Sequence, residues 1–145
     1  TILSQEPERL EAVLPRDSRL RFERSAETIA GTLAGMIAAG RLRYPVLVTT
    51  ADHALLDPAT VAEFTAAAAG ADLAIGVIEE RVLRRRFPTS QRTWIGFRGG
   101  RYSGANLFAL GSAKAALVIE RWRAVEQDRK KGWRMLSALG PALLI

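Results

Sequence analysis

The sequence predicts a three-layer α/β/α fold built around a mainly parallel sheet, with one antiparallel hairpin. Strand-like and helix-like segments alternate over residues 1–87, which is typical of parallel sheets covered by helices on both faces. An apolar run over residues 45–50 is followed by Asp52 and then by a new helix, as at the end of a strand inside such a sheet. Gly99 and Gly100 later separate two apolar strand patterns, which predicts a hairpin.

The first part of the chain shows strand and helix signals in turn. Residues 1–14 are expected to be a strand end followed by a short helix beginning at Pro7, and residues 20–23 a short strand. Ser25 is the expected N-cap of the next helix, and Gly40 marks its C-terminal end. Apolar side chains between them fall on one face at helical spacing: Ile29, Ala30, Leu33, Met36 and Ile37.

The strand over residues 45–50 is expected to be buried on both faces, because residues 46–48 are apolar without alternation. Asp57 and Pro58 then form a helix start signal, a capping side chain followed by proline at the first helical position. This helix is expected to run to Gly70. The remaining elements are expected in this order: a strand over 72–79, a basic helical turn or loop over 80–87, a hairpin of strands 92–97 and 102–110, and helices over 112–130 and 133–139.

Composition narrows the class of protein. The chain has 145 residues, 48% of them hydrophobic and 25% charged, so it can bury a core, and residues 1–145 are expected to form one domain. It contains no cysteine, which excludes disulfides, thiolate metal sites and a cysteine nucleophile, and which fits a cytoplasmic protein. No apolar run approaches the length of a membrane span.

The net charge of +6 admits several interpretations. A basic protein can present a surface for nucleic acid or anionic membranes, or it can hold a polyphosphate substrate. The basic residues fall into two clusters, residues 81–86 and residues 121–134, both interleaved with apolar residues. Each cluster is equally well explained as a solvated face beside a packed stripe.

Asp52 is the first candidate for chemistry. It follows a strand at its carboxyl end, where ligands bind in open α/β sheets, and its carboxylate could hold a divalent cation against a phosphate. The alternative is an aspartate that caps the turn after the strand. Asp57 is a weaker candidate, because its place before Pro58 already explains it as a helix cap. His53, the only histidine, is either a general base or a loop residue with a local hydrogen bond.

Asn106 and Arg92 form a second set of candidates. Asn106 is a polar residue in an apolar strand, and its amide oxygen suits Mg²⁺ when a carboxylate supplies the charge. Gly104 just before it would let backbone or ligand come close. Asn106 could instead close the hairpin through hydrogen bonds. Arg92 could bind a phosphate oxygen in a forked arrangement or pair with a neighbouring acid.

Two segments carry a resemblance to a known family. The segment Val46-Leu-Val-Thr-Thr-Ala-Asp52-His-Ala-Leu-Leu resembles the metal-site strand of nucleotidyltransferases with the GT-A fold, a Rossmann-like fold shared by the nucleotide-diphospho-sugar transferases. It is most similar to NTP transferases grouped with molybdenum-cofactor guanylyltransferase. The segment from Arg92 to Phe108, which includes Ser-Gly-Ala-Asn-Leu-Phe, is similar to one in poorly characterised bacterial members. The resemblance spans residues 20–140.

The resemblance implies an enzyme that transfers a nucleotidyl group from an NTP to a phosphorylated or hydroxylated small-molecule acceptor and releases pyrophosphate. Asp52 matches the aspartate that binds catalytic Mg²⁺, and Asn106 matches the residue that completes the metal site. Ser25 lies where relatives approach the nucleotide or acceptor. In this reaction Arg92 and one residue of a basic group would hold acceptor or pyrophosphate, and that group is Arg129, Lys130 and Lys131.

Two departures from the family pattern leave other functions open. Relatives often carry proline where this chain has Ala54, and their Gly-rich nucleotide-binding loop has no counterpart before Ser25. We therefore expect the sequence to be incomplete at its N-terminus. The alternatives are a glycosyltransferase on the same fold, a nucleotide-binding domain without turnover, and a basic nucleic-acid-binding domain. No stable nucleic-acid partner is expected, and the hairpin over residues 92–110 is a plausible homodimer surface.

Overall fold

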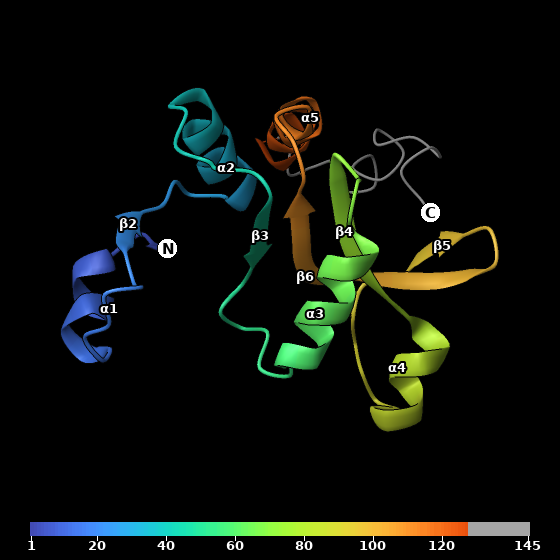
Figure 1. The fold of residues 1–145 in the computed structure, drawn as a ribbon. Coiled ribbons are helices and arrows are strands. Elements are labelled where there is room, and N and C mark those ends of the chain that lie inside the picture. Colours follow the sequence, from blue (N-terminus) through green and yellow to red (C-terminus); the bar gives the residue numbers. More distant parts are fainter. Residues whose placement is uncertain (128–145) are drawn as a thin grey trace. The chain divides into compact units, whose positions relative to one another are not determined.

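The computed structural model describes residues 1–127 (Figure 1). This part of the chain falls into two compact units, and each is described by itself. Unit 1 comprises Thr1–Leu42 and the segment that begins at Ala116, and unit 2 comprises Arg43–Ala115. Helices and strands occur in both units, so the predicted α/β class is confirmed.

Unit 1 is built from a short parallel sheet and helices. Its elements are β1 (Ile2–Ser4), α1 (Pro7–Val13), β2 (Phe22–Arg24), α2 (Ile29–Ala38) and α5 (Ala115–Gln127, of which the first residue belongs to unit 2). Strands β1 and β2 pair in parallel, with Ile2 opposite Phe22. The predicted apolar face of α2 is confirmed, because its buried residues include Ala30, Leu33 and Met36.

The predicted N-cap of α2 is wrong. Thr28, not Ser25, caps the helix, and its hydroxyl accepts a hydrogen bond from the Gly31 N–H at 3.0 Å. Ser25 instead donates its backbone N–H to the Ser4 carbonyl at 2.8 Å, which continues the pairing of β1 and β2 by one residue. The chain is therefore still extended at Ser25. The predicted end of the helix is confirmed, because Gly40 has φ of +64°.

Unit 2 contains one four-stranded sheet and two helices. Its elements are β3 (Val46–Thr49), α3 (Pro58–Ala67), β4 (Leu73–Glu79), α4 (Glu80–Arg86), β5 (Ile95–Phe97) and β6 (Gly100–Leu110). The order in the sheet is β3-β6-β4, and β5 pairs with β6 (Figure 1). Strand β6 runs antiparallel to both β3 and β4, so these two strands run parallel to one another. The predicted hairpin of β5 and β6 is confirmed, with Gly99 at φ of +101° in its turn.

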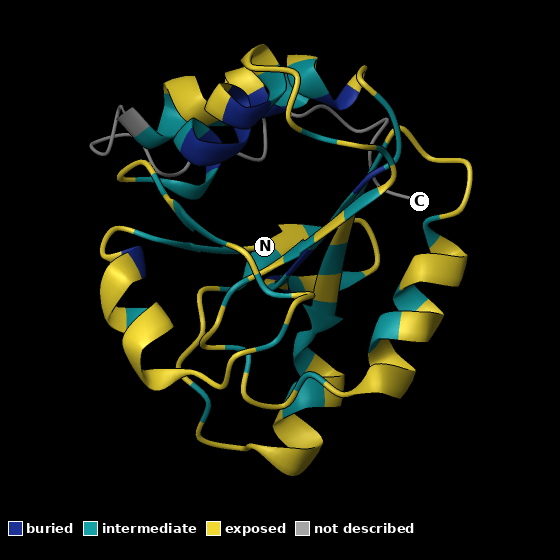
Figure 2. Ribbon diagram, turned by 60° about the vertical axis from the view of Figure 1, so that its left-hand side comes forward, coloured by how far each residue is buried: buried dark blue, intermediate teal, exposed yellow. Residues whose placement is uncertain are grey.

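The expectation that β3 is buried on both faces is wrong. Leu47 is 40% exposed, and β4 likewise exposes Ile75 and Val77 (Figure 2). In the described part of the chain β3 pairs only with β6, so it is an edge strand of its sheet. The deeply buried strand of this sheet is β6, where Leu107 and Leu110 are 3% and 0% exposed.

Helix boundaries in unit 2 follow their capping residues. Asp57 caps α3 as predicted, since its carboxylate accepts from the Thr60 N–H at 2.7 Å, and this hydrogen bond lowers the pKa of Asp57. Residues 80–87 were expected to form a helical turn or a loop, and the structure has the helix α4 there. Helix α5 begins at Ala115 rather than Ser112. The Ser112 hydroxyl donates to the Asp72 carboxylate at 2.5 Å and accepts from the Lys114 N–H at 3.1 Å in the turn before the helix.

The helix predicted over residues 133–139 and the basic group Arg129, Lys130 and Lys131 lie outside the described residues. Within residues 1–127, no helix has both the length and the apolar character needed to cross a membrane.

Candidate functional site

The turn after β3 presents Asp52 at the end of the strand, as the sequence predicts. Backbone hydrogen bonds close this turn, with the His53 N–H donating to the Thr50 carbonyl at 3.2 Å. The Asp52 carboxylate accepts a hydrogen bond from the Thr50 hydroxyl. Within residues 1–127 this carboxylate accepts no hydrogen bond from a backbone N–H, so the Asp52 side chain does not cap the turn.

A bulge in β6 places Asn106. Between the paired residues Ile75 and Val77, β4 has only Gly76, whereas β6 has residues 105–107 between their partners. The extra residues disrupt the ladder locally, and Asn106 adopts φ of +51°, a left-handed conformation that asparagine tolerates better than most residues. Bulges often redirect side chains next to functional sites, so this irregularity marks Asn106 as a candidate functional residue.

Gly76 makes the bulge possible. A Cβ at Gly76 would lie 3.2 Å from both the Cβ and the carbonyl oxygen of Leu107, so a side chain there would press on the bulged strand. At Gly104, by contrast, no atom lies within 4 Å of the corresponding position. The close approach of backbones expected at Gly104 therefore occurs at Gly76. A glycine inside the apolar strand pattern of residues 73–79 is the sequence signal for it.

Two hydrogen bonds tie the segment around Asn106 to its neighbours. The Thr49 hydroxyl donates to the Asn106 carbonyl at 3.0 Å, which joins the bulge to the end of β3. The Arg92 guanidinium donates through Nη2 to the Gly104 carbonyl at 3.1 Å, which holds this arginine beside the bulge. The backbone on both sides of the Asn106 side chain is thus fixed.

The predicted residues Asp52, Arg92 and Asn106 line one cavity of about 650 Å³, which lies within unit 2. Its walls come from the turn after β3, the bulge of β6, the facing part of β4 and one side of α3. Three segments that are far apart in the sequence are thereby brought together. Their roles in binding or catalysis stay predictions.

Helix α3 contributes Glu63, a residue that the sequence reasoning missed. The cavity-lining residues of α3 follow helical spacing, and they are Thr60, Glu63, Phe64 and Ala67. Glu63 is exposed, and within the described chain it forms no ion pair. Thr60 lies three residues before Glu63 and Ala67 four residues after it, so helical spacing is the signal that could have placed Glu63 on the same face.

The donor set of the cavity suits Mg²⁺. Asp52, Glu63 and Asn106 all offer oxygen atoms, which hard divalent cations prefer. Residues 1–127 contain no group of three or more His, Cys, Asp or Glu side chains placed to hold a metal ion. One or two carboxylates are what proteins usually give Mg²⁺, which keeps waters and substrate phosphates as its other ligands. The residues present therefore fit this ion.

The other predicted residues are placed as follows. His53 is half-buried and lines the cavity, and its Nδ1 is buried without a hydrogen-bond partner in the described chain. The local hydrogen bond expected of a loop histidine is therefore not made by this nitrogen. Ser25 belongs to unit 1 and does not line the cavity of unit 2.

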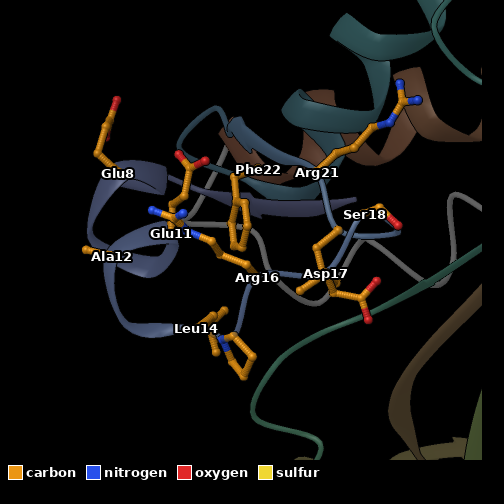
Figure 3. A pocket seen from close by; sticks show the side chains of 11 residues that line it. Glu8, Glu11, Ala12, Leu14, Arg16, Asp17, Ser18, Arg21 and Phe22 are labelled. Atoms are coloured by element: carbon orange, nitrogen blue, oxygen red, sulfur yellow. The ribbon is translucent and has the colours of Figure 1, made fainter.

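Unit 1 has an open cavity of its own, of about 760 Å³, between α1 and the loop that leads to β2. Figure 3 shows its charged side chains spread around the ring of Phe22. Several of these charges are neutralised locally, because Asp17 pairs with Arg19 at 2.6 Å and Glu8 pairs with Arg24 at 2.6 Å. None of the residues predicted from the sequence to be functional lines it.

Comparison with known proteins supports the fold. No family model and no curated protein matches the sequence. Among solved structures, the chain is similar to a hypothetical transferase from Thermus thermophilus, with a TM-score of 0.65 and 23% identity. The similarity covers 83% of this chain and 52% of the other, so this chain spans about half the length of the structure it matches. The two chains share an α/β fold.

Proposed function

We propose that the protein is an Mg²⁺-dependent nucleotidyltransferase, which moves an NMP group from an NTP to a phosphorylated or hydroxylated acceptor and releases pyrophosphate. The observation that carries this proposal is the presence of Asp52, Asn106 and Arg92 around one cavity. The fold shared with a hypothetical transferase also favours an enzyme of the transferase class. The resemblance of the segments around Asp52 and Asn106 to nucleotidyltransferases supplies the finer assignment.

The cavity has the size and lining expected of a nucleotide site. Small-molecule pockets commonly enclose about 300–1,000 Å³ and combine apolar walls with a few converging polar groups. The cavity of unit 2 measures about 650 Å³ and sets Phe64, Leu83 and Leu107 against the polar residues already described. The apolar wall would take the base or sugar, and the polar end would take the phosphates.

The residues at the polar end have complementary tasks. Asp52 and Asn106 would hold Mg²⁺, with Glu63 as a further oxygen donor, and the bound ion would offset negative charge on the phosphates. Arg92, held beside the bulge by its bond to Gly104, would bind a phosphate oxygen with its remaining N–H groups. The bond to the Gly104 carbonyl places Arg92 against β6 two residues before Asn106.

The proposed chemistry needs no protein nucleophile. An acceptor oxygen forms a bond to the α-phosphorus, the bond from that phosphorus to the bridging oxygen breaks, and pyrophosphate leaves. Rate enhancement in such transfers comes mainly from alignment of the reactants and from positive charge near the phosphorus. The absence of cysteine is consistent with this type of reaction.

The test compares two aspartates of the same loop. Asp52→Asn removes the carboxylate in the cavity, whereas Asp57→Asn removes one that caps α3 and does not line it. Asparagine is also a good N-cap, so the second variant should fold normally. With the full-length protein, Mg²⁺ and each of ATP, CTP, GTP and UTP, we expect Asp52→Asn to lower pyrophosphate release at least about 100-fold. We expect Asp57→Asn to stay within about twofold of the wild type.

Equal activity of the Asp52→Asn variant and the wild type would refute the proposal. Thermal shifts with the same nucleotides give a second readout. An NTP that stabilises the protein only when Mg²⁺ is present, and less in the Asp52→Asn variant, would support the assignment of Asp52 as a metal ligand.

A further inference from the structure

The net charge of the chain is concentrated in one segment. Residues 79–101 contain seven arginines, no lysine and two glutamates, which gives this segment +5 of the total net charge of +6. We call residues 79–101 the arginine segment. Guanidinium groups bind phosphates in a forked geometry that an ammonium group does not provide. Residues 1–113 contain no lysine at all, so what sets this segment apart is the density of its arginines rather than the choice of arginine over lysine.

Ion pairs divide these arginines into two groups. Glu79 pairs with Arg81, and Glu80 pairs with both Arg84, at 2.7 Å, and Arg101, at 3.0 Å. Both acids of the arginine segment are thus engaged. Within residues 1–127, four arginines of the segment have no ion pair, and they are Arg85, Arg86, Arg92 and Arg98.

Aromatic rings lie directly beside the basic groups. The Arg86 guanidinium lies 5.7 Å from the ring centre of Phe87, and the Arg84 guanidinium lies 6.0 Å from that of Trp94. Phe87 is 38% exposed, so part of its ring can receive a further flat group. Basic side chains interleaved with accessible rings are the arrangement that binds single-stranded nucleic acid, because bases stack on the rings while phosphates meet the cations.

The arginine segment also adjoins the cavity of unit 2. Leu83 of α4 and Arg92 both line that cavity, and Arg85 and Arg86 of α4 are exposed. A chain of phosphates could therefore follow the surface of α4 toward Arg92. This continuity distinguishes the arginine segment from basic residues scattered elsewhere.

Other anionic partners fit less well. A membrane surface would need a longer amphipathic helix, but α4 has only seven residues, and its Leu83 lines the cavity. An acidic peptide would satisfy the guanidinium groups but would leave the exposed ring of Phe87 without a role. The paired arrangement of arginine and aromatic ring favours a ligand with phosphates and bases.

From these observations we infer that α4 and the following loop bind single-stranded nucleic acid, with Arg85 and Arg86 on the phosphates and Phe87 stacked on a base. The sequence alone favours no stable nucleic-acid partner, and the pairing pattern of the arginines is what changes this expectation. This binding goes beyond the proposed nucleotidyl transfer and does not depend on it.

Fluorescence anisotropy with a labelled single-stranded RNA of about 20 nucleotides and mixed sequence tests the inference on the full chain. If all four arginines without an ion pair, Arg85, Arg86, Arg92 and Arg98, contact phosphates, affinity should fall roughly 50-fold between 50 and 200 mM salt, following a slope of about −0.7 per contact. The double variant Arg85→Gln/Arg86→Gln should bind more weakly and lose only roughly sevenfold over the same range. Phe87→Ala should weaken binding at least about fivefold with an unchanged salt slope.

Three controls make the result specific. The double variant Arg16→Gln/Arg43→Gln removes the same charge from two other exposed arginines and should retain wild-type affinity within about twofold. Asp52→Asn should not weaken RNA binding, so the result separates this inference from the proposed transfer reaction. Circular dichroism checks that each variant is folded.

Certain outcomes would overturn the inference. If both double variants lost affinity equally, binding would reflect diffuse charge rather than α4. If polyglutamate or vesicles of anionic phospholipid competed as well as RNA at equal charge, the partner would be an acidic protein or a membrane instead. No detectable RNA binding at 50 mM salt would overturn it outright.

Discussion

One cavity in each unit offers a comparison, because the two have similar volumes but differ in how their acidic side chains are held. In unit 1 the lining acids Asp17 and Glu8 each pair with an arginine, whereas a third lining acid, Glu11, forms no ion pair in the described chain. In unit 2 the cavity-lining acids Asp52 and Glu63 form no ion pair in the described chain. Volume alone would rank the cavity of unit 1 first, at about 760 Å³ against about 650 Å³.

This contrast teaches that irregular backbone beside unpaired acids marks a candidate site better than volume does. Charged groups that are paired contribute locally to structure, whereas unpaired groups that converge on a cavity are available to a ligand. The cavity of unit 2 is also lined by Asn106, which has a left-handed backbone conformation in a bulge. Such a conformation costs free energy and persists only where the surrounding structure maintains it. The following predictions test this contrast.

Removing the bulge should have the largest effect. Gly76→Val would place side-chain atoms against the Cβ and the carbonyl of Leu107, which are already 3.2 Å from the Cβ position. Overpacking of this kind costs about 1–3 kcal/mol, so we expect a lower free energy of unfolding, measured by urea denaturation. We also expect weaker binding of Mg²⁺ with nucleotide, because the Asn106 amide would move.

Gly96→Val is the matched control. It adds the same side chain to a glycine of β5 that has no atom within 4 Å of its Cβ position. This variant should unfold within about 0.5 kcal/mol of the wild type. If the two valine variants behaved alike, the bulge would not owe its geometry to Gly76.

Asn106 allows stability and binding to be separated. At φ of +51°, Asn106→Gly removes side-chain strain and should keep or raise stability, by up to about 1 kcal/mol, while it removes the amide oxygen. Asn106→Val should destabilise the fold by about 1–3 kcal/mol, because a β-branched residue resists this conformation. Titration calorimetry with Mg²⁺ and an NTP should show weaker binding by the stable glycine variant. Unchanged affinity of that variant would remove Asn106 from the site.

Local sequence signals predicted the parts of this site that depend on neighbours in the chain. Asp52 lies after an apolar strand, and Asp57 with Pro58 begins a helix, because strand ends and caps are determined within a few residues. The same reasoning misplaced the cap of α2 at Ser25. Serine and threonine are both good caps, and the pairing of Ser25 with Ser4, which no local pattern reveals, leaves Thr28 to act as the cap.

The remaining features of the fold and of the site depend on pairing between strands that are far apart in the sequence. Strand β6 lies between β3 and β4, and this placement depends on contacts between residues far apart in the sequence. The order of elements along the chain therefore predicted the hairpin of β5 and β6 but not the pairing of β6 with β3 and β4. The bulge opposite Gly76 follows from that pairing, as does the burial of Leu107 beside an edge strand. Glu63 could have been found from the helical spacing of Thr60, Glu63 and Ala67, but only the cavity shows that this side of α3 faces the site.

The smallest expected effect concerns the paired charges of unit 1. The Arg19 side chain, with help from its backbone N–H, lowers the pKa of Asp17 from its ordinary value of 3.8. A carboxyl whose pKa is lower in the folded state stabilises the protein above its unfolded pKa, and this contribution is lost as the pH falls through the folded pKa. Asp17→Asn should therefore lower Tm slightly at pH 7, by less than about 2 °C for so exposed a pair, and this difference should shrink as the pH falls below the ordinary pKa of 3.8.

The same variant completes the comparison of the two cavities. Thermal shifts caused by Mg²⁺ with an NTP should be equal for Asp17→Asn and the wild type, because Asp17 acts on its own loop and not on a ligand. A loss of the nucleotide-induced shift in this variant would mean that the cavity of unit 1 takes part in binding. Paired charge would then be no guide to which cavity is functional, and the assignment of the site to unit 2 would have to be revised.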